Sequence, residues 1–375
     1  MIFQTPALGM REEEVLEDIR GQWRRLKHLL ATEPYRWSRS LRRVTFAKAI
    51  RGSNSIEGIE VSPEDALAAV DLEEPIEASE ETRKAISGYH SAMTYVLRLA
   101  TDPGFRYDEN LLRGLHYIML HHEWSKHPGT WRPGPVHVQD GATGQIVYRA
   151  PREDLVPLLM QELTEGLRAR EDASPMVRAA MAHLNLVMIH PFSDGNGRMA
   201  RCLQTLVLAR AGVLDSTFCS IEEYLGANSQ AYYRVLAQVG GGSWKPNNDA
   251  LPWVRFNLTA HYRQAGTALR RQQEHSEVWG EVEELCSRLG VNSRCVPSLC
   301  DAAFGARVQN RWHRQHAEVS QVVASRDLAG LVKLGLLEAE GKLKGRYYLA
   351  SVRLRELRDR HRHKKPIEDP FERAG

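Results

Sequence analysis

A stretch of twelve residues, 190–201, contains the side chains that phosphate-transfer chemistry requires. It reads His-Pro-Phe-Ser-Asp-Gly-Asn-Gly-Arg-Met-Ala-Arg. The imidazole of His190 titrates in a range suited to taking a proton from an attacking hydroxyl near neutral pH. The carboxylate of Asp194 is a suitable oxygen ligand for a Mg²⁺ ion that bridges phosphates. Together these two groups predict in-line attack of a hydroxyl on a nucleotide phosphate.

The second half of this stretch is suited to binding the phosphates themselves. Gly195 and Gly197 permit backbone angles and close approaches that a side chain would prevent. A helix that begins here leaves backbone N–H groups unpaired at its N-terminus, where the helix dipole favours an anion. Arg198 and Arg201 lie three residues apart in its first turn and can each bind a phosphate through two hydrogen bonds. Each feature alone has an ordinary structural explanation, but their order within twelve residues favours the phosphate site.

Two predicted helices must meet around this stretch. Apolar residues recur at helical spacing through 176–189, and Pro191 ends that helix, so His190 is expected at its buried C-terminal end. A second helix follows at 198–211. Amphipathic spacing predicts further helices at 12–30, 41–51, 83–99, 109–121, 152–168, 229–239 and 253–269.

A β-hairpin interrupts this helical pattern. Alternating apolar residues at 136–138 and 146–148 flank the turn-rich segment 140–144, which is the signature of a hairpin. Near the C-terminus, a helix at 320–334 is followed by short strands at 336–338 and 346–349. That order is the layout of a winged helix-turn-helix.

The twelve-residue stretch resembles the signature of the Fic family, His-x-Phe-x-(Asp/Glu)-Gly-Asn-Gly-Arg-x-x-Arg, and matches every fixed position of it. The resemblance implies a helical core that transfers AMP from ATP to a hydroxyl of a target protein. It leads us to expect a mainly α protein: a Fic-type helical bundle with a β-hairpin flap, plus a C-terminal winged helix-turn-helix. In the related Doc-type kinases lysine replaces the glycine at the position of Gly195, so glycine here favours AMP transfer over phosphorylation.

The resemblance also assigns a role to each motif residue. His190 would deprotonate a Ser, Thr or Tyr of the target, and Phe192 would anchor the loop in the core. The remaining residues would bind the nucleotide and its metal: Asp194 the Mg²⁺ (or Mn²⁺), Gly195, Asn196, Gly197 and Arg198 the α and β phosphates of ATP, and Arg201 the γ phosphate.

An earlier segment, 53–58, resembles the inhibitory motif of the same family, Ser/Thr-x-x-x-Glu-Gly/Asn. It reads Ser53-Asn-Ser-Ile-Glu57-Gly58. By this resemblance Glu57 would form a salt bridge with Arg201, withdraw it from the γ phosphate and leave ATP misplaced for attack. The simpler interpretation is a capped helix end with a solvated Glu57. A further role for Glu57, positioning water to remove AMP from a modified target, stays open.

Two regions are expected to complete the site. Residues 129–150 resemble the family's flap, where Val136, His137 and Val138 would pair with a segment of the target through main-chain hydrogen bonds. The alternative is an ordinary surface hairpin. The adenine pocket is expected beside the helix at 229–239. Its candidate residues, each with a core role as an equal alternative, are Tyr224, Asn228, Tyr232 and Tyr233.

We expect four regions along the chain. These are an N-terminal helical region (1–100) with the inhibitory motif, a catalytic core (101–270), a winged helix domain (276–351) and a basic tail (352–375). The expected partners are the target hydroxyl, the chain itself through self-modification and a possible second copy in a homodimer. A transcription regulator is the rival function, because the C-terminal region carries cations for DNA phosphates: Arg326 and Lys333 on the helix, and Lys342, Lys344 and Arg346 on the wing.

The composition is that of a soluble globular protein. The chain has 375 residues, 42% of them hydrophobic, and a net charge of +3, which by itself does not indicate a nucleic-acid binder. No apolar run approaches the roughly 20 residues needed to cross a bilayer. The five cysteines form no metal-binding pattern and are expected to be buried thiols in a reducing compartment. We therefore expect a cytoplasmic protein with no membrane contact.

Overall fold

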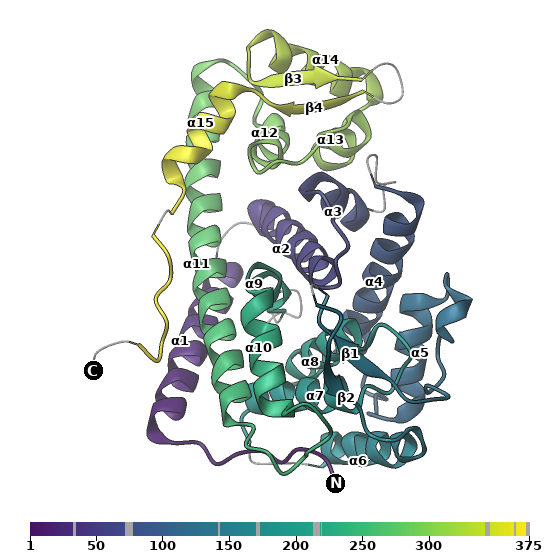
Figure 1. Cartoon of the computed structure of the whole chain (residues 1–375). Helices are drawn as coiled ribbons and strands as arrows, with labels where there is room; N and C mark the ends of the chain where they lie inside the picture. Colours follow the sequence, from purple (N-terminus) through teal and green to yellow (C-terminus); the bar gives the residue numbers. More distant parts are fainter. Residues whose placement is uncertain are drawn as a thin grey trace. The chain divides into compact units, whose positions relative to one another are not determined.

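The computed structural model describes the whole chain except residues 33–34, 72–77, 142, 170–172, 213–217, 219, 342–345, 364 and 373–375. The described part is mainly helical, with two small two-stranded sheets, and Figure 1 shows the order of its elements. The longer helices are α1 (Met10–Thr32), α2 (Tyr35–Ile56), α3 (Pro63–Val70), α4 (Glu80–Leu99), α5 (Glu109–Leu120), α6 (Val156–Arg168), α7 (Pro175–Ile189), α8 (Asn196–Arg210), α9 (Glu222–Ala227), α10 (Ser229–Gly240), α11 (Leu251–Arg288), α12 (Val296–Ala303), α13 (Asn310–Ala317), α14 (Gln321–Lys333) and α15 (Val352–His361). The short 3-10 helices are η1 (Trp124–Lys126), η2 (Glu153–Leu155) and η4 (Ser293–Cys295), and the strands are β1 (His137–Gln139), β2 (Ile146–Arg149), β3 (Leu337–Glu340) and β4 (Tyr347–Ala350).

The helices predicted from periodicity are all present, with shifts at their ends. The largest difference concerns α11, which runs unbroken from Leu251 to Arg288 through the composition change at 272–276. The composition change therefore does not mark a break in this helix. The short helices α3 and α9 were not predicted, because 8 and 6 residues carry too little periodic signal.

The chain divides into two compact units. Unit 1 comprises residues 1–27, 46–265 and 368–375, and unit 2 comprises residues 28–45 and 266–367. This grouping differs from the expected succession of regions, because parts of α1, α2 and α11 belong to each unit.

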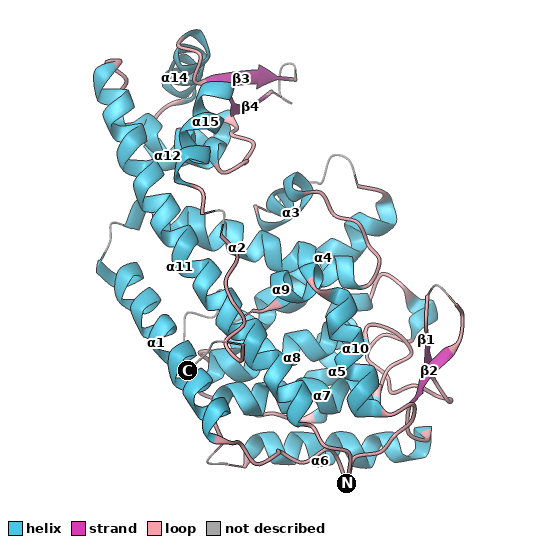
Figure 2. Cartoon of the chain, turned by 60° about the vertical axis from the view of Figure 1, so that its left-hand side comes forward, coloured by secondary structure: helices cyan, strands magenta, loops and turns pink. Residues whose placement is uncertain are grey.

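At the centre of unit 1, α7 and α8 pack together. Helices α4, α5, α6 and α10 surround them (Figures 1 and 2). Helix α7 begins with Pro175, whose fixed φ suits the first helical position. Its apolar residues are buried on nearly every side, and Leu184 and Ile189 are fully buried. Burial on all sides fixes both helices, and the segment that joins them is the twelve-residue motif.

Unit 2 contains helices α12, α13 and α14 followed by the antiparallel hairpin β3–β4. Val308 forms an isolated antiparallel bridge to Tyr348 beside this two-stranded hairpin. The buried imidazole of His313 on α13 contacts both neighbouring helices. It lies 2.7 Å from Ser298 Oγ of α12 and 3.2 Å from the Asp327 carboxylate of α14. The predicted wing residues Lys342 and Lys344 lie outside the described residues.

The segment expected to be a basic tail is partly a folded helix. Leu354 and Leu357 of α15 are buried, and its cations pair with acidic residues of α11. Arg358 Nε lies 3.0 Å from Glu274, and His361 Nε2 lies 2.6 Å from Glu281. These pairs match part of the basic charge of this segment within unit 2.

Two other expectations can be compared with the described residues. Among them, no helix combines the length and the apolar content that crossing a membrane would require. Four cysteines, Cys202, Cys286, Cys295 and Cys300, are free and buried, as expected, and Cys219 lies outside the described residues.

Three buried histidines make the stability of unit 1 sensitive to acid. Burial lowers the pKa of His183 to about 3, and the pKa values of His116 and His261 to about 4, from the ordinary 6.5. Between pH 6.5 and about 4 the unfolded chain therefore binds more protons than the folded one. As the pH is lowered through this range, we expect the free energy of unfolding to fall by about 1.4 kcal/mol per pH unit for each histidine.

Denaturant unfolding at a series of pH values measures this slope. His261→Gln removes one of the three groups, so it is expected to make the slope shallower. A free energy of unfolding that is independent of pH over this range would contradict the prediction.

Candidate active site

His190 is held at the end of α7 in an uncommon backbone conformation. Its φ of 52° and ψ of 57° lie in the left-handed region, which costs a non-glycine residue roughly 1–3 kcal/mol and here ends helix α7. The buried Arg132 holds this conformation in place. Its Nε donates to the His190 carbonyl at 2.8 Å, and its backbone N–H donates to the Pro191 carbonyl at 2.9 Å. No motif or spacing in the sequence predicts this role for Arg132.

The imidazole of His190 is oriented to act as a base. Its Nδ1 lies 3.1 Å from the carbonyl of Val187, and since a carbonyl only accepts, Nδ1 carries the proton. The lone pair is then on Nε2. Burial lowers the pKa of His190, so the imidazole is neutral at neutral pH and able to accept a proton.

The loop after His190 is fixed by contacts inside the protein. The Asn196 side chain accepts from the Phe192 N–H and donates to the Phe192 carbonyl, both at 2.9 Å. His116 stacks on the Phe192 ring with centroids 3.8 Å apart. The His116 Nε2 donates to the Asp194 carbonyl at 3.1 Å, and its Nδ1 accepts from the Gly129 N–H at 2.9 Å. Because the Asn196 side chain is used in this way, only its backbone N–H is left to bind an anion.

The N-terminus of α8 is a strong anion site. Arg198 is only 5% exposed, and its Nε has no hydrogen-bond partner among the described residues. A buried N–H donor without a partner is costly, so an anion in the cavity that Arg198 lines would be stabilised here. Gly195 has a φ of 73°, and a Cβ there would lie 2.9 Å from Leu120 Cδ1. Glycine is thus required by both the backbone angle and the space.

The carboxylate of Asp194 fits a divalent metal beside this anion site. It is about one third exposed, and its Oδ2 lies 3.3 Å from the Lys126 ammonium. A Mg²⁺ ion usually takes one or two carboxylates together with phosphate oxygens and water. Asp194 is placed to give one such ligand, and the nearby Lys126 shows that the position favours positive charge.

Glu57 stands at the end of α2 because that helix ends in a Schellman motif. Gly58 has a φ of 77°, its N–H donates to Ser55, and the Ile59 N–H donates to Asn54, each at 3.1 Å. The helix end is therefore capped as the simpler interpretation required. Glu57, however, is only 24% exposed, and its Oε1 lies 2.7 Å from Arg201 Nη2, so it forms an ion pair that the simpler interpretation did not include.

The guanidinium of Arg201 is enclosed by residues of α2. Its Nε donates to Ser53 Oγ at 2.8 Å, and its Nη2 donates to the Ser53 carbonyl at 3.1 Å as well as to Glu57. Burial disfavours its charged form, but the Glu57 carboxylate outweighs this effect and raises the pKa of Arg201. Nη1 has no partner among the described residues. One donor of the group is thus left for another acceptor.

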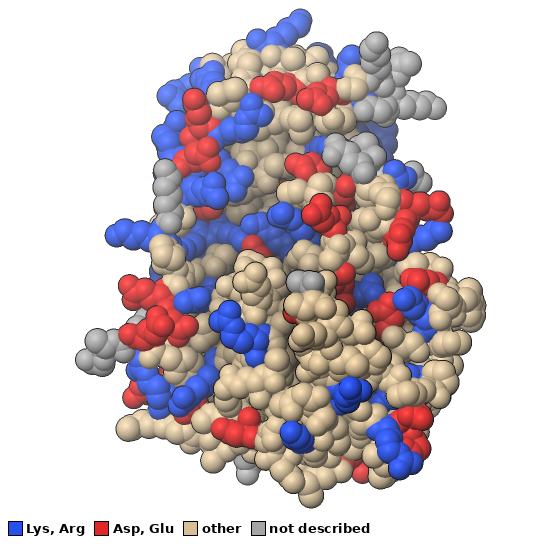
Figure 3. All heavy atoms as spheres, viewed as in Figure 1, with Lys and Arg blue, Asp and Glu red and all other residues tan. Residues whose placement is uncertain are grey.

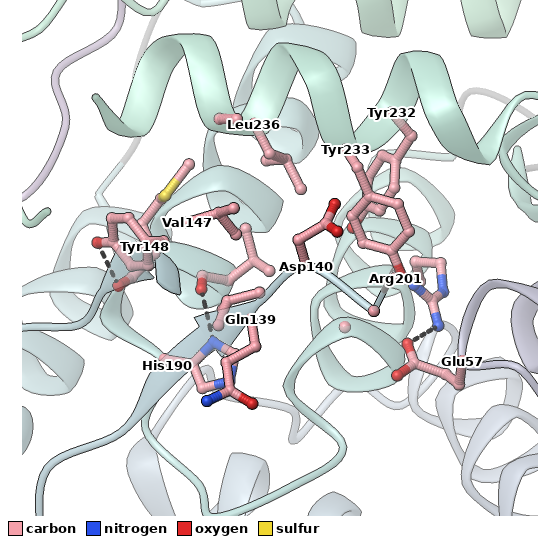
Figure 4. A pocket seen from close by; sticks show the side chains of 16 residues that line it. Glu57, Gln139, Asp140, Val147, Tyr148, His190, Arg201, Tyr232, Tyr233 and Leu236 are labelled. Atoms are coloured by element: carbon pink, nitrogen blue, oxygen red, sulfur yellow. Dashed lines mark hydrogen bonds and ion pairs between the residues drawn. The ribbon is translucent and has the colours of Figure 1, made fainter. Parts of the chain in front are cut away.

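The Glu57 carboxylate occupies the anion site itself. A Cβ on Gly197 would lie 2.5 Å from Glu57 Oε1, so the carboxylate lies directly against the first turn of α8. Two cavities of about 480 Å³ lie on either side of it, and Glu57 lines both. One contains His190 and Arg201, and the other contains Asp194 and Arg198. Figure 4 shows the first cavity with the Arg201–Glu57 pair at one side.

The hairpin β1–β2 covers the first cavity. Of the predicted flap residues, Val138 lines the cavity, His137 is exposed, and Val136 precedes the strand. Gln139 and Asp140, which were not predicted, also line it (Figure 4). Ile146 and Val147 of β2 are exposed. In Figure 3, few charged side chains appear in the lower central part, where Figure 1 places β2 and α10.

The four residues proposed for the adenine pocket separate into two groups. Tyr232 and Tyr233 line the first cavity, although Tyr232 is buried and its hydroxyl lies 2.9 Å from His183 Nε2. Tyr224 and Asn228 lie outside its lining. The Tyr224 ring packs against Phe256 instead, and the Asn228 amide donates to the Tyr224 carbonyl. Only Tyr233, which is 47% exposed, offers an open aromatic face among the four.

The comparisons with known proteins agree with this arrangement. Residues 106–208 match the model of the Fic/DOC family. The Protein adenylyltransferase Fic of Drosophila ananassae is 39% identical over 144 residues, which cover 38% of this chain and 25% of the relative. The protein of the same name from Nematostella vectensis is 27% identical over 208 residues, which cover 54% and 44%. Residues 106–208 thus match the Fic/DOC family, and the chain is similar to these adenylyltransferases but spans less than half the length of each.

Solved structures show the same fold. A Fic family protein from Desulfovibrio desulfuricans G20 has a TM-score of 0.61 at 20% identity, covering 93% of this chain and 99% of the other. A Fic domain containing signaling protein from Bacteroides thetaiotaomicron has a TM-score of 0.56 at 22% identity, covering 68% and 96%. At these identities the likeness concerns the fold, which is the mainly helical Fic fold with small two-stranded sheets.

The environment of His190 predicts its titration. We expect the pKa of His190, followed by NMR and assigned from the spectrum of His190→Asn, to lie below the ordinary 6.5 in the folded protein. In denaturant the value should return to about 6.5, because the burial that lowers it is lost. A folded-state pKa at or above 6.5 would overturn the assignment of His190 as a neutral base.

Proposed function

We propose that this protein is an adenylyltransferase that moves AMP from ATP to a Ser, Thr or Tyr hydroxyl of a target protein and of itself. The observation that carries the proposal is the position of His190. Its unprotonated Nε2 opens on the cavity that also holds Arg201 and the first turn of α8. Asp194 and Arg198 line the second cavity, and Glu57 lines both cavities, so the base faces one part of a polyphosphate site whose other part begins beyond Glu57. A base beside such a site is what in-line transfer to a hydroxyl requires.

The reaction follows from these positions. The target hydroxyl attacks the α phosphorus, and His190 Nε2 takes its proton as the new P–O bond forms. The bond from the α phosphorus to the oxygen that bridges to the β phosphate breaks, and pyrophosphate leaves. Arg198 and the N–H groups of α8 hold the departing phosphates. When bound, Mg²⁺ at Asp194 supplies charge neutralisation for the leaving group.

Glycine at position 195 supports AMP transfer rather than phosphorylation. A lysine at this position, as in the Doc-type kinases, would meet Leu120 and adopt a strained positive φ. The loop therefore has no cationic side chain here to reverse the bound nucleotide.

We further propose that the enzyme is restrained by its own helix α2. Glu57 holds the Nη2 of Arg201 and occupies the space in front of Gly197. The γ phosphate must displace the carboxylate to reach the same donors, because two anions cannot share them without strong repulsion. The site is complete but held inactive.

Replacing Glu57 tests both proposals. Glu57→Gly is expected to raise self-modification with labelled ATP by roughly a hundredfold, the effect of correcting a misplacement of about 1 Å. His190→Ala in the same background should abolish the label. Glu60→Gly is the matched control, since Glu60 is exposed and has no ion pair among the described residues. Equal labelling of the wild type and Glu57→Gly would reject the restraint, and labelling that survives His190→Ala would reject the base.

AMP removal is the alternative activity of the same site. One observation favours it, since only the Oε1 of Glu57 is used by Arg201 and the carboxylate is partly exposed. Its second oxygen is therefore able to orient water. Label that the wild type removes from the modified Glu57→Gly protein would assign removal as a function.

The rival function, DNA binding by unit 2, has one observation in its favour. Helices α13 and α14 followed by the β3–β4 hairpin fit a winged helix, and α14 is then the helix that would enter the groove. Arg311, Arg326 and Lys333 are exposed on these helices and form no ion pair among the described residues. The only acidic residue of α14, Asp327, is turned inward to Arg294.

A gel shift with the DNA upstream of the gene tests this proposal. We expect retardation at low salt that weakens by roughly tenfold or more between about 50 and 200 mM salt, as phosphate contacts require. Arg326→Ala with Lys333→Ala should weaken it at all salt concentrations. Arg234→Ala on the exposed side of α10 is the control. No retardation by the wild type at low salt would remove DNA binding.

A further inference from the structure

We infer that the corner formed by α9 and α10 holds the end of α2 in its inhibitory position, with the Tyr233 hydroxyl as the positioning contact. The inference rests on the proposed restraint by Glu57. It assigns to Tyr233 a second role, separate from lining the nucleotide cavity. The evidence comes from two contacts that lie on either side of the last turn of α2.

The first contact is a close approach of backbones between α2 and α9. A Cβ on Gly226 would lie 2.7 Å from the Cα of Gly52 and 2.9 Å from Ser55 Oγ. A Cβ on Gly52 would lie 2.3 Å from the carbonyl oxygen of Glu222. Neither position has room for a side chain, so these two glycines set how closely α2 lies on α9.

Helix α9 is itself fixed to the core of unit 1. The Glu222 carboxyl is fully buried, contacts the Tyr89 hydroxyl of α4 and accepts from Ser220 Oγ at 2.7 Å. Burial raises the pKa of Glu222 well above its ordinary range, which favours its protonated form. Buried hydrogen bonds therefore tie the surface on which α2 lies to the core of unit 1.

The second contact is a hydrogen bond at the C-terminus of α2. The Tyr233 hydroxyl donates to the carbonyl of Ile56 at 2.8 Å. Carbonyls in the last turn of a helix have no partner within the helix, so an outside donor there fixes the helix end. Ile56 is followed directly by Glu57, and partial burial raises the pKa of Tyr233 to about 12, so the donor keeps its proton.

These contacts predict that removing the Tyr233 hydroxyl raises the rate of transfer, whereas removing an ordinary nucleotide contact lowers it. Its ring lies on the side of the cavity that carries the Arg201–Glu57 pair, away from His190 (Figure 4). Loss of a group that only binds ATP lowers the rate of transfer. Loss of the hydroxyl alone keeps the ring and loosens the carbonyl next to Glu57, which raises the rate if the corner holds the restraint.

The test compares Tyr233→Phe with the wild type in self-modification by labelled ATP, with kcat and the KM for ATP measured separately. We expect kcat to rise roughly two- to tenfold, the equivalent of one neutral hydrogen bond. In the Glu57→Gly background, Tyr233→Phe should give no further rise, because the restraint is already gone. Gly226→Ala, which displaces α2, should also raise kcat. Gly166→Ala in α6, where a Cβ meets nothing within 4 Å, is its control.

The outcomes distinguish the positioning role of Tyr233 from the restraint by Glu57. A rise in Glu57→Gly together with an unchanged or lowered kcat in Tyr233→Phe would overturn the inference and leave the restraint intact. A rise in Tyr233→Phe of the same size in both backgrounds would also overturn it, because the effect would then not pass through Glu57. No rise in Glu57→Gly would overturn both.

Discussion

The arrangement of the site depends on the guanidinium of Arg201. Its side chain is only 1% exposed, and a buried cation requires an anion beside it. Helix α2 meets that requirement from within the chain through Ser53 and Glu57. An incoming phosphate offers the same charge and more acceptor oxygens, and Nη1 remains available to it. The same guanidinium thus stabilises the protein through Glu57 and would stabilise a bound phosphate. Activity and stability are therefore linked at this residue.

His190 and the loop at Asp194 are held in place by two buried residues, Arg132 and His116. Arg132 fixes the backbone of His190, and His116 fixes the loop at Asp194. Both act through backbone carbonyls, and both are buried. A left-handed histidine and a tight glycine loop are uncommon conformations, and these contacts hold them between α7 and α8. The backbone of the motif is therefore positioned by contacts inside the protein.

What could be predicted from the sequence was local. The twelve-residue motif and the helices around it are continuous in the chain, so periodicity and motif spacing were enough to place them. The link from Glu57 to Arg201 joins residues 144 apart, and family resemblance alone pointed to it. Arg132, His116 and the Tyr233–Ile56 contact left no pattern in the sequence, since each depends on tertiary packing. Tyr224 and Asn228 were chosen by type and position along the chain, but the turn of α9 directs them away from the cavity.

Gly195 restricts how this chain can change over evolution. A positive φ and the side chain of Leu120 both exclude a larger residue there. A single substitution that introduces lysine would strain the backbone and collide with the core, so its first effect would be on folding. The residue at position 195 is therefore coupled to Leu120 of α5, and a larger side chain at one position requires a change of packing at the other.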